Sequence, residues 1–123
     1  MTFVTRPVYN HAMPDCIFCK IVKGERPGRK VYEDDDIFAF HDNNPQAPTH
    51  ILIVPKEHIP TIEDASPEML GKLLKIATEI ARSEGIAKKG YRTVINCGDY
   101  AGQSVYHLHV HLLGGRWLHW PPG

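Results

Sequence analysis

The sequence predicts an α+β domain, with a largely antiparallel sheet of about five strands beside one long and one short helix. Three observations support this. Short β-rich runs follow one another at hairpin-like spacing, one long segment has apolar residues at helical spacing, and the 123 residues are 42% hydrophobic and 23% charged. A chain of this size forms one domain whose core needs no disulfide bonds. We expect a flexible leader over residues 1–13 and the folded domain over 14–123, including a tail at 114–123.

The two helices are expected on either side of the first β-rich runs. Asp15 is the expected N-cap of a short helix that extends through Lys23. Ser66 followed by Pro67 is typical of a helix start, because the hydroxyl caps a free amide and proline suits the first turn. The apolar stripe that follows predicts a helix ending near Gly85.

The strands are predicted from runs of β-branched and aromatic residues. These runs cover residues 30–33, 37–40, 49–54, 91–96 and 104–113. The acidic residues 34–36 lie between the first two runs and predict the turn of a hairpin. Pro55 ends the third run, since proline cannot donate to a sheet.

The charge balance excludes several classes of partner. Lys plus Arg and Asp plus Glu both number 14, so no net charge favours nucleic acid or an anionic membrane. The apolar run 51–54 is too short to span a bilayer. The first residues lack the apolar stretch of a secretory signal, and three cysteines do not form an extracellular disulfide framework. We expect a cytoplasmic protein that binds neither nucleic acid nor membrane.

The most informative segment is 107–113, which reads His-Leu-His-Val-His-Leu-Leu. In a strand, its three histidines share one face and the apolar residues between them share the other. The backbones of His107 and His111 would lie roughly 13 Å apart. Metal–nitrogen bonds are only about 2 Å long, so one metal does not gather all three histidines, although a neighbouring pair could share one. At least one histidine is then left for other work, and a free imidazole with a pKa near neutral can act as a nucleophile or a general acid–base group.

The loop over residues 96–104 precedes these histidines and contains two glycines. Its free backbone amides, with Asn96 and Ser104, can cradle a phosphate. It lacks the Gly-Lys-Ser/Thr of a P-loop, and a glycine-rich loop is often only a turn. Its position beside the histidines is what favours a phosphate site.

Cys16 and Cys19 form a Cys-x-x-Cys pair that can supply two corners of a tetrahedral zinc site. His50 and His107 are the expected remaining ligands. The alternative is a pair of half-buried free thiols. Cys97 is expected to be a small buried apolar residue.

Several stretches together resemble the histidine-triad (HIT) superfamily, and within it the Hint branch. They are residues 39–42, 45–50, 102–107, 107–113 and 119–123. The resemblance extends from about residue 15 to the C-terminus. It implies a HIT-like fold and a homodimer whose sheet continues across the interface. It also implies no organic cofactor, and in several bacterial members a structural Cys₂His₂ zinc.

The resemblance implies hydrolysis of the P–N bond in purine nucleoside 5′-phosphoramidates, such as adenosine 5′-monophosphoramidate and aminoacyl-AMP conjugates. His109 would be the nucleophile and form a nucleotidyl-histidine intermediate. His111 would donate to the phosphate oxygens, and Ser104 would help the leaving amine depart. His107 and His50 complete the expected catalytic set.

The resemblance also implies a nucleotide site for AMP or GMP. Asp42 would accept from the ribose hydroxyls, whereas Asn43 departs from the apolar residue that touches the base in many relatives. Ile17, Phe18, Ile21 and Phe40 would line the purine cleft, with plain core packing as the alternative. The full expected set is Asp42, Asn43, Asn96, Gly102, Gln103, Ser104, His109, His111, Ile17, Phe18, Ile21, Phe40 and, at the end of the tail, Trp120.

Two other functions stay open on the sequence. One is a metal-dependent hydrolase that uses a metal-activated water, which chelators would inactivate. The other is a nucleotide-binding or scaffolding protein with incidental hydrolysis, which would tolerate the loss of His109.

Overall fold

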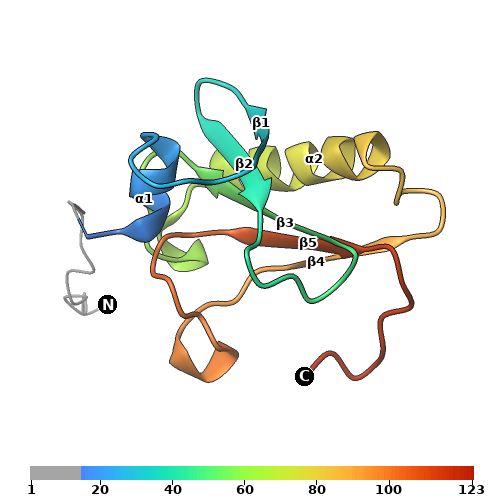
Figure 1. Cartoon of the computed structure of the whole chain (residues 1–123). Coiled ribbons are helices and arrows are strands. Elements are labelled where there is room, and N and C mark those ends of the chain that lie inside the picture. The colour runs from blue at the N-terminus through green and yellow to red at the C-terminus, as the bar shows by residue number, and fades with distance from the viewer. Residues whose placement is uncertain (1–14) are drawn as a thin grey trace.

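A computed structural model describes residues 15–123, so the leader expected at 1–13 lies outside the described residues. One antiparallel sheet has the strand order β1-β2-β3-β5-β4 (Figure 1). Its strands are β1 (Lys30–Glu33), β2 (Ile37–His41), β3 (Thr49–Pro55), β4 (Tyr91–Val94) and β5 (Val110–Gly114). The helices are α1 (Ile17–Val22) and α2 (Pro67–Ser83), with short 3₁₀ turns at Ile62–Asp64 and Asp99–Ala101. The predicted α+β fold is confirmed.

The sheet separates two apolar layers, because side chains alternate along each strand. In β2, Ile37 and Ala39 face α2, whereas Phe38 and Phe40 face α1. The layer beneath α2 is the larger one. It contains the apolar residues that alternate with the histidines, Leu108, Val110 and Leu112, as predicted.

The start and end of α2 are confirmed by its capping contacts. The Ser66 hydroxyl accepts from the amide of Met69 at 3.1 Å, and Pro67 occupies the first turn. The helix ends at Ser83, and Gly85 follows with a φ of +79°, a left-handed conformation that glycine adopts without strain. An apolar face along the helix lies on the sheet, as the spacing predicted.

The helix α1 begins one residue later than expected. Cys16, and not Asp15, is its N-cap, and the Cys16 Sγ accepts from the amide of Cys19 at 3.4 Å. The Asp15 side chain is exposed. Phe18 and Ile21 are buried against Phe38 and Phe40 of β2 and anchor the helix to the sheet.

The last predicted strand is much shorter than expected. Only Val110–Gly114 is a strand. Its pairing with β3 begins at Ile53↔Val110, and the residues before Val110 are not paired with β3. Beyond that pair, β3 ends at Pro55, which has no amide to donate. The amide of Leu108 donates instead to the Ile59 carbonyl, beyond the end of β3.

Within residues 15–123, no helix has both the length and the apolar character needed to cross a membrane. Cys97 is exposed, so the expectation that it is buried was wrong. It follows β4 in the loop that leads to the second 3₁₀ turn, where no apolar layer covers it.

Candidate active site and metal centre

His109 lies just before β5, on the sheet face that carries α1. Its Nδ1 is 2.7 Å from the His107 carbonyl. A carbonyl can only accept, so Nδ1 carries the proton and the ring's lone pair is on Nε2. Burial lowers the pKa of His109, against the opposing effect of this hydrogen bond. The ring is therefore neutral near pH 7, with a nitrogen prepared for nucleophilic attack.

His111, His50 and Gln46 form a hydrogen-bonded chain beside that nucleophile. The Gln46 amide donates to Nδ1 of His50 at 3.0 Å. The proton of His50 is consequently on Nε2, which donates to Nδ1 of His111 at 2.9 Å. This leaves the His111 proton on Nε2, the nitrogen available to donate to a substrate oxygen.

The pKa shifts agree with this neutral chain. Burial lowers the pKa of His111 to about 4, and nearby His109 and His50 contribute to the shift. Burial also lowers the pKa of His50, against the charge of Asp42. The ring centroids of His109 and His111 are 5.0 Å apart, close enough for one phosphate group to contact both rings.

Asp42 lies next to the hydrogen-bonded chain of Gln46, His50 and His111. Its Oδ2 lies 3.4 Å from Nε2 of His50, and its Oδ1 accepts from the amide of Asn44 at 2.8 Å. A carboxylate has about four acceptor positions, so Asp42 keeps capacity for further donors. Asn43, next in the chain, is exposed.

The loop before the histidines is built around Gln103. Its buried amide accepts from the amide of Gly98 at 2.9 Å, and donates to the carbonyls of Pro60 at 2.8 Å and Val105 at 3.1 Å. The Gln103 side chain therefore shapes the loop. The backbone amides of Gly102 and Gln103 donate to the carbonyls of Asp99 and Gly98 at 3.0 and 3.1 Å, so the expectation that these amides are free to cradle a phosphate was wrong. Gly102, with a φ of +86°, and Ser104 are exposed, whereas Asn96 is half-buried.

Most residues expected at the purine cleft belong to an apolar layer. Phe18, Ile21 and Phe40 are buried there, and Ile17 is half-buried beside them. The Phe18 ring lies edge-on to His109, with centroids 5.1 Å apart, so this layer does border the nucleophile. Core packing, which was the alternative to lining a purine cleft, is thus part of the role of these four residues.

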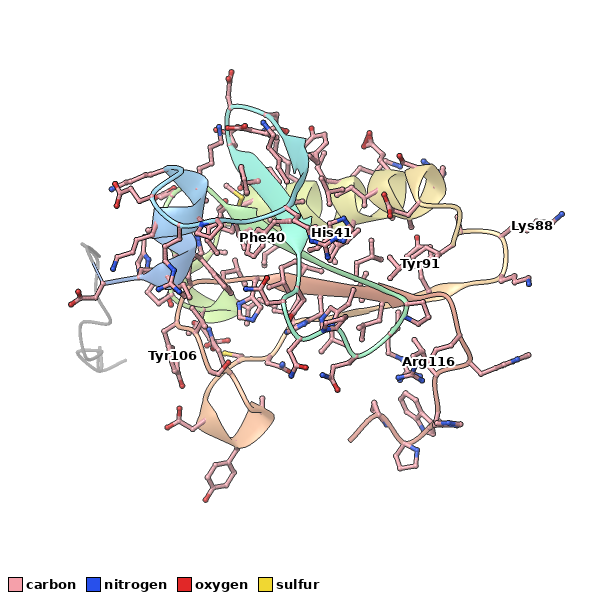
Figure 2. All side chains as sticks on the ribbon, viewed as in Figure 1. Phe40, His41, Lys88, Tyr91, Tyr106 and Arg116 are labelled. Atoms are coloured by element: carbon pink, nitrogen blue, oxygen red, sulfur yellow. The ribbon has the colours of Figure 1, made fainter. Side chains whose placement is uncertain are left out.

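Trp120 is placed elsewhere in the described chain. Arg92 of β4 donates to the His119 carbonyl at 2.9 Å and lies 5.9 Å from the centre of the Trp120 ring. The tail is therefore docked on β4, and the Trp120 ring is mostly exposed. Arg116, labelled in Figure 2, holds the start of the tail by donating to the Gln46 carbonyl at 2.8 Å.

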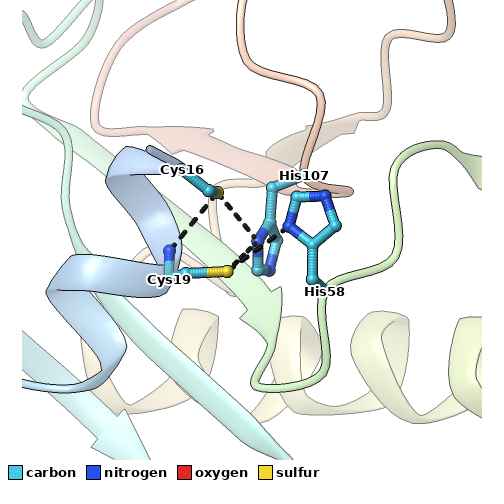
Figure 3. A group of neighbouring side chains, drawn as sticks. All are labelled: Cys16, Cys19, His58 and His107. Atoms are coloured by element: carbon cyan, nitrogen blue, oxygen red, sulfur yellow. Dashed lines mark hydrogen bonds between the residues drawn. The ribbon is translucent and has the colours of Figure 1, made fainter. Parts of the chain in front are cut away.

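A second cluster brings Cys16 and Cys19 together with His58 and His107 (Figure 3). Nδ1 of His107 is 3.4 Å from the Cys16 Sγ and 3.5 Å from the Cys19 Sγ. Nδ1 of His58 is 3.3 Å from the Cys19 Sγ. Sulfur and nitrogen ligands of a tetrahedral zinc are separated by about 3.5 Å, so these atoms fit one ion.

The expectation that His50 is a ligand of this site was wrong. His50 pairs with Leu113 in the sheet, and its Nε2 donates to His111, so it lies in the cluster with Asp42 and His111. His58 follows the end of β3. Because β3 and β5 are antiparallel, this end lies beside the start of β5, which His107 precedes. The sequence reasoning missed His58, although the end of β3 at Pro55 indicated which residues lie nearest to His107.

Hydrogen-bond chemistry distinguishes the two clusters as metal sites. Nε2 of His107 donates to the Pro55 carbonyl at 2.8 Å, which leaves Nδ1 free of a proton, as in typical metal-binding histidines. Asp42, His50 and His111 also lie close together. There, however, Nδ1 of His50 accepts a hydrogen bond from the Gln46 amide, so the proton is on Nε2 and a metal bound to Nε2 would require an imidazolate. Of these two clusters in residues 15–123, the cysteine-containing one therefore fits a metal better.

The HIT domain family model matches residues 23–118, and the chain belongs to the HIT family. A purine nucleoside phosphoramidase of Escherichia coli is 51% identical over 105 residues, covering 83% of this chain and 88% of that protein. A 14 kDa zinc-binding protein of Zea mays is 54% identical over 112 residues, covering 87% of each. The structure of a HIT family hydrolase from Legionella pneumophila matches with a TM-score of 0.86 and 52% identity, covering 89% of this chain and 100% of that one.

Proposed function

We propose that this protein is a purine nucleoside phosphoramidase, which hydrolyses the P–N bond of nucleoside 5′-phosphoramidates. The observation that carries the proposal is the pair of tautomers. His109 has its lone pair on Nε2, and the neighbouring His111 has its proton on Nε2. A nucleophile and a donor are thus prepared side by side. The relative from Escherichia coli supports the choice of substrate class.

In the first step, Nε2 of His109 attacks the α-phosphorus and forms a P–N bond to the enzyme. The substrate P–N bond breaks and its electron pair leaves with the amine, which takes up a proton from solvent relayed by the exposed Ser104 hydroxyl. His111 donates to a phosphate oxygen as negative charge develops there. The amides of Gly102 and Gln103 already donate to the carbonyls of Asp99 and Gly98, so Ser104 is the loop residue left to add a donor.

In the second step, water attacks the phosphorus and the bond to His109 breaks, which returns the lone pair to Nε2. The product nucleotide keeps the water oxygen. One water proton returns to solvent and the other stays on the product phosphate, so His109 and His111 keep their starting tautomers. Splitting one displacement in two explains the need for a nucleophile that is also a good leaving group.

Asp42 binds the ribose in this proposal. It has acceptor capacity left after its contacts with Asn44 and His50, and two ribose hydroxyls match one carboxylate. Asn43 and Asn96 lie near the nucleoside. The purine packs at the rim of the apolar layer, where Ile17 is half-buried.

We further propose that the cluster of Cys16, Cys19, His58 and His107 holds a zinc ion. Four protein ligands close the coordination shell, which is typical of a structural site and leaves no position for substrate. The maize relative supports zinc as the metal. A metal-activated water is disfavoured, because Nε2 of His50 already donates to Nδ1 of His111 and is not available to bind a metal there.

We also propose a homodimer whose sheet continues across the interface. The outer edge of β4 has no strand partner among residues 15–123. Trp120 is docked on this strand, so the tail would meet the second subunit there. Sedimentation of the full chain tests this: a monomer at micromolar concentration would contradict it.

The function is tested by AMP release from adenosine 5′-monophosphoramidate at neutral pH. Wild type should turn over, and His109→Ala should lose activity by at least about 10³-fold while still binding AMP. Cys97→Ser changes an exposed thiol and should match wild type. Turnover by His109→Ala at the wild-type rate would exclude the covalent mechanism. AMP binding by wild type without turnover would favour the nucleotide-binding alternative.

A further inference from the structure

The metal cluster contacts the nucleophile through the backbone of His107. The His107 carbonyl accepts the Nδ1 proton of His109, which keeps the lone pair on Nε2. The side chain of the same residue is held by both cysteines and by the Pro55 carbonyl. Whatever fixes the His107 ring therefore also fixes the carbonyl that sets the tautomer of His109.

A second contact passes through α1. Cys16 and Cys19 lie on either side of Phe18, whose ring is edge-on to both His109 and His107, with centroids 5.1 and 5.9 Å apart. The helix has six residues, which is too short to be stable alone. Its N-cap is the Cys16 thiol itself. The position of Phe18 against the nucleophile thus depends on the two cysteines.

His109 has little other support from the sheet. The β5 ladder begins at Val110, so residues 107–109 are outside the regular strand. A residue within a ladder is oriented by hydrogen bonds on both sides. His109 is instead held by its bond to His107 and by the rings of Phe18 and His111, and the first two of these contacts depend on residues of the cluster.

We infer that the Cys16–Cys19–His58–His107 cluster is a positioning element for His109, and that filling it with a divalent metal raises the rate of attack without raising nucleotide affinity. None of its members touches the reacting atoms in the proposed reaction. The inference rests on the proposed function for the role of His109. Replacing a residue that orients a functional group without touching the substrate typically lowers activity by about 10- to 100-fold.

His58 offers the cleanest test, because it is the cluster member that lies outside both residues 16–22 and residues 107–109. His58→Ala removes a ligand, whereas His58→Cys keeps a four-ligand set of a kind that zinc accepts. Cys97→Ser is the matched control for thiol chemistry. Each protein is assayed for bound zinc, for AMP affinity by calorimetry, and for the single-turnover rate of nucleotide transfer to His109.

The expected result is a split between rate and affinity. His58→Ala should lose zinc and slow the single-turnover step by about 10- to 100-fold, with AMP affinity within about twofold of wild type. His58→Cys should restore both zinc and rate. A zinc-free, folded His58→Ala that reacts at the wild-type rate would overturn the inference. So would an AMP affinity that falls in step with the rate, because that indicates a collapsed pocket.

A second measurement covers the case in which His58→Ala does not fold. In wild type, the ring nitrogens of His109 are followed by ¹⁵N NMR during titration with a zinc chelator. We expect one Nδ1-protonated tautomer with the metal, and a mixture of tautomers after its removal. An unchanged tautomer in the metal-free, folded protein would refute positioning. This readout needs no turnover, so failure of the proposed function alone would leave it intact.

Discussion

Nε2 of His50 lies 2.9 Å from Nδ1 of His111, and the amide of Gln46 fixes which of these two nitrogens is the donor. A backbone amide thus determines the protonation pattern of a ring two hydrogen bonds away. His111 presents a proton to the substrate because His50 cannot accept on the side facing it. The relationship makes His50 a positioning residue for His111.

Replacing His50 should therefore affect the rate more than substrate binding. His50→Leu removes the donor to His111, and we expect kcat to fall by about 10²-fold, the effect of a misplaced group. His50→Gln can still donate an N–H towards Nδ1 of His111 and should recover part of the loss. Steady-state kinetics with adenosine 5′-monophosphoramidate measures both variants. Equal losses for Leu and Gln would show that the donor is not what matters.

The stability of the fold should fall in acid, and His111 should contribute to this fall. Burial holds its native pKa at about 4, below the 6.5 of an unfolded histidine. The unfolded chain therefore binds more protons between these values, and the contribution of His111, complete above pH 6.5, is lost as the pH falls towards 4. Urea unfolding at pH 7 and pH 5 measures this change.

His111→Gln has no titrating ring, so its stability should change less between pH 7 and pH 5 than that of wild type. His119→Gln replaces an exposed histidine of the tail and should keep the wild-type dependence. A wild-type dependence in His111→Gln would place the acid sensitivity in another group.

The buried amide of Gln103 should be a large contributor to stability. Gln103→Leu leaves the Gly98 amide and the Pro60 carbonyl without their partner, at a cost of about 2–4 kcal/mol in the free energy of unfolding. Gln103→Glu keeps an acceptor for Gly98 but turns an oxygen towards the Pro60 carbonyl. We expect it to be at least as destabilising, by urea denaturation. A stable Glu variant would contradict the hydrogen-bond pattern.

The cap of α2 should make a smaller, separable contribution. Ser66→Ala removes the acceptor for the Met69 amide and should cost about 1 kcal/mol. Ser66→Asp keeps an acceptor and adds a favourable charge near the helix N-terminus, so it should match or exceed wild type. Thermal unfolding compares the two. Neither variant should change kcat, because α2 lies on the sheet face opposite His109.

The elements that the sequence predicted well are those with strong local signals. Ser66-Pro67 and Gly85 marked the ends of α2, and the alternation in 107–113 placed Leu108, Val110 and Leu112 in the core. These signals depend on residues close in the chain. The prediction failed for Asp15, because the cap of α1 was decided by a thiol that also belongs to a distant cluster.

The choice between His50 and His58 shows what sequence reasoning lacked. Both histidines are near β3, and either can bind a metal. The pair His50↔Leu113 in the sheet register separates His50 from His107, and register was not available from one strand alone. The role of Gln103 could not be predicted from the sequence either, because its partners Gly98 and Pro60 lie in separate loops.

The contact between Cys16 and His107 joins residues 91 positions apart. At about 5–20 residues per second, a ribosome needs roughly 5 to 18 s to add that length of chain. During this time both thiols have emerged or are emerging without their last imidazole partner. His107 and the nucleophile His109 are then made almost together. A nascent chain therefore acquires the last member of the cluster and the nucleophile within two residues of each other. A chain that is terminated before His107 has neither.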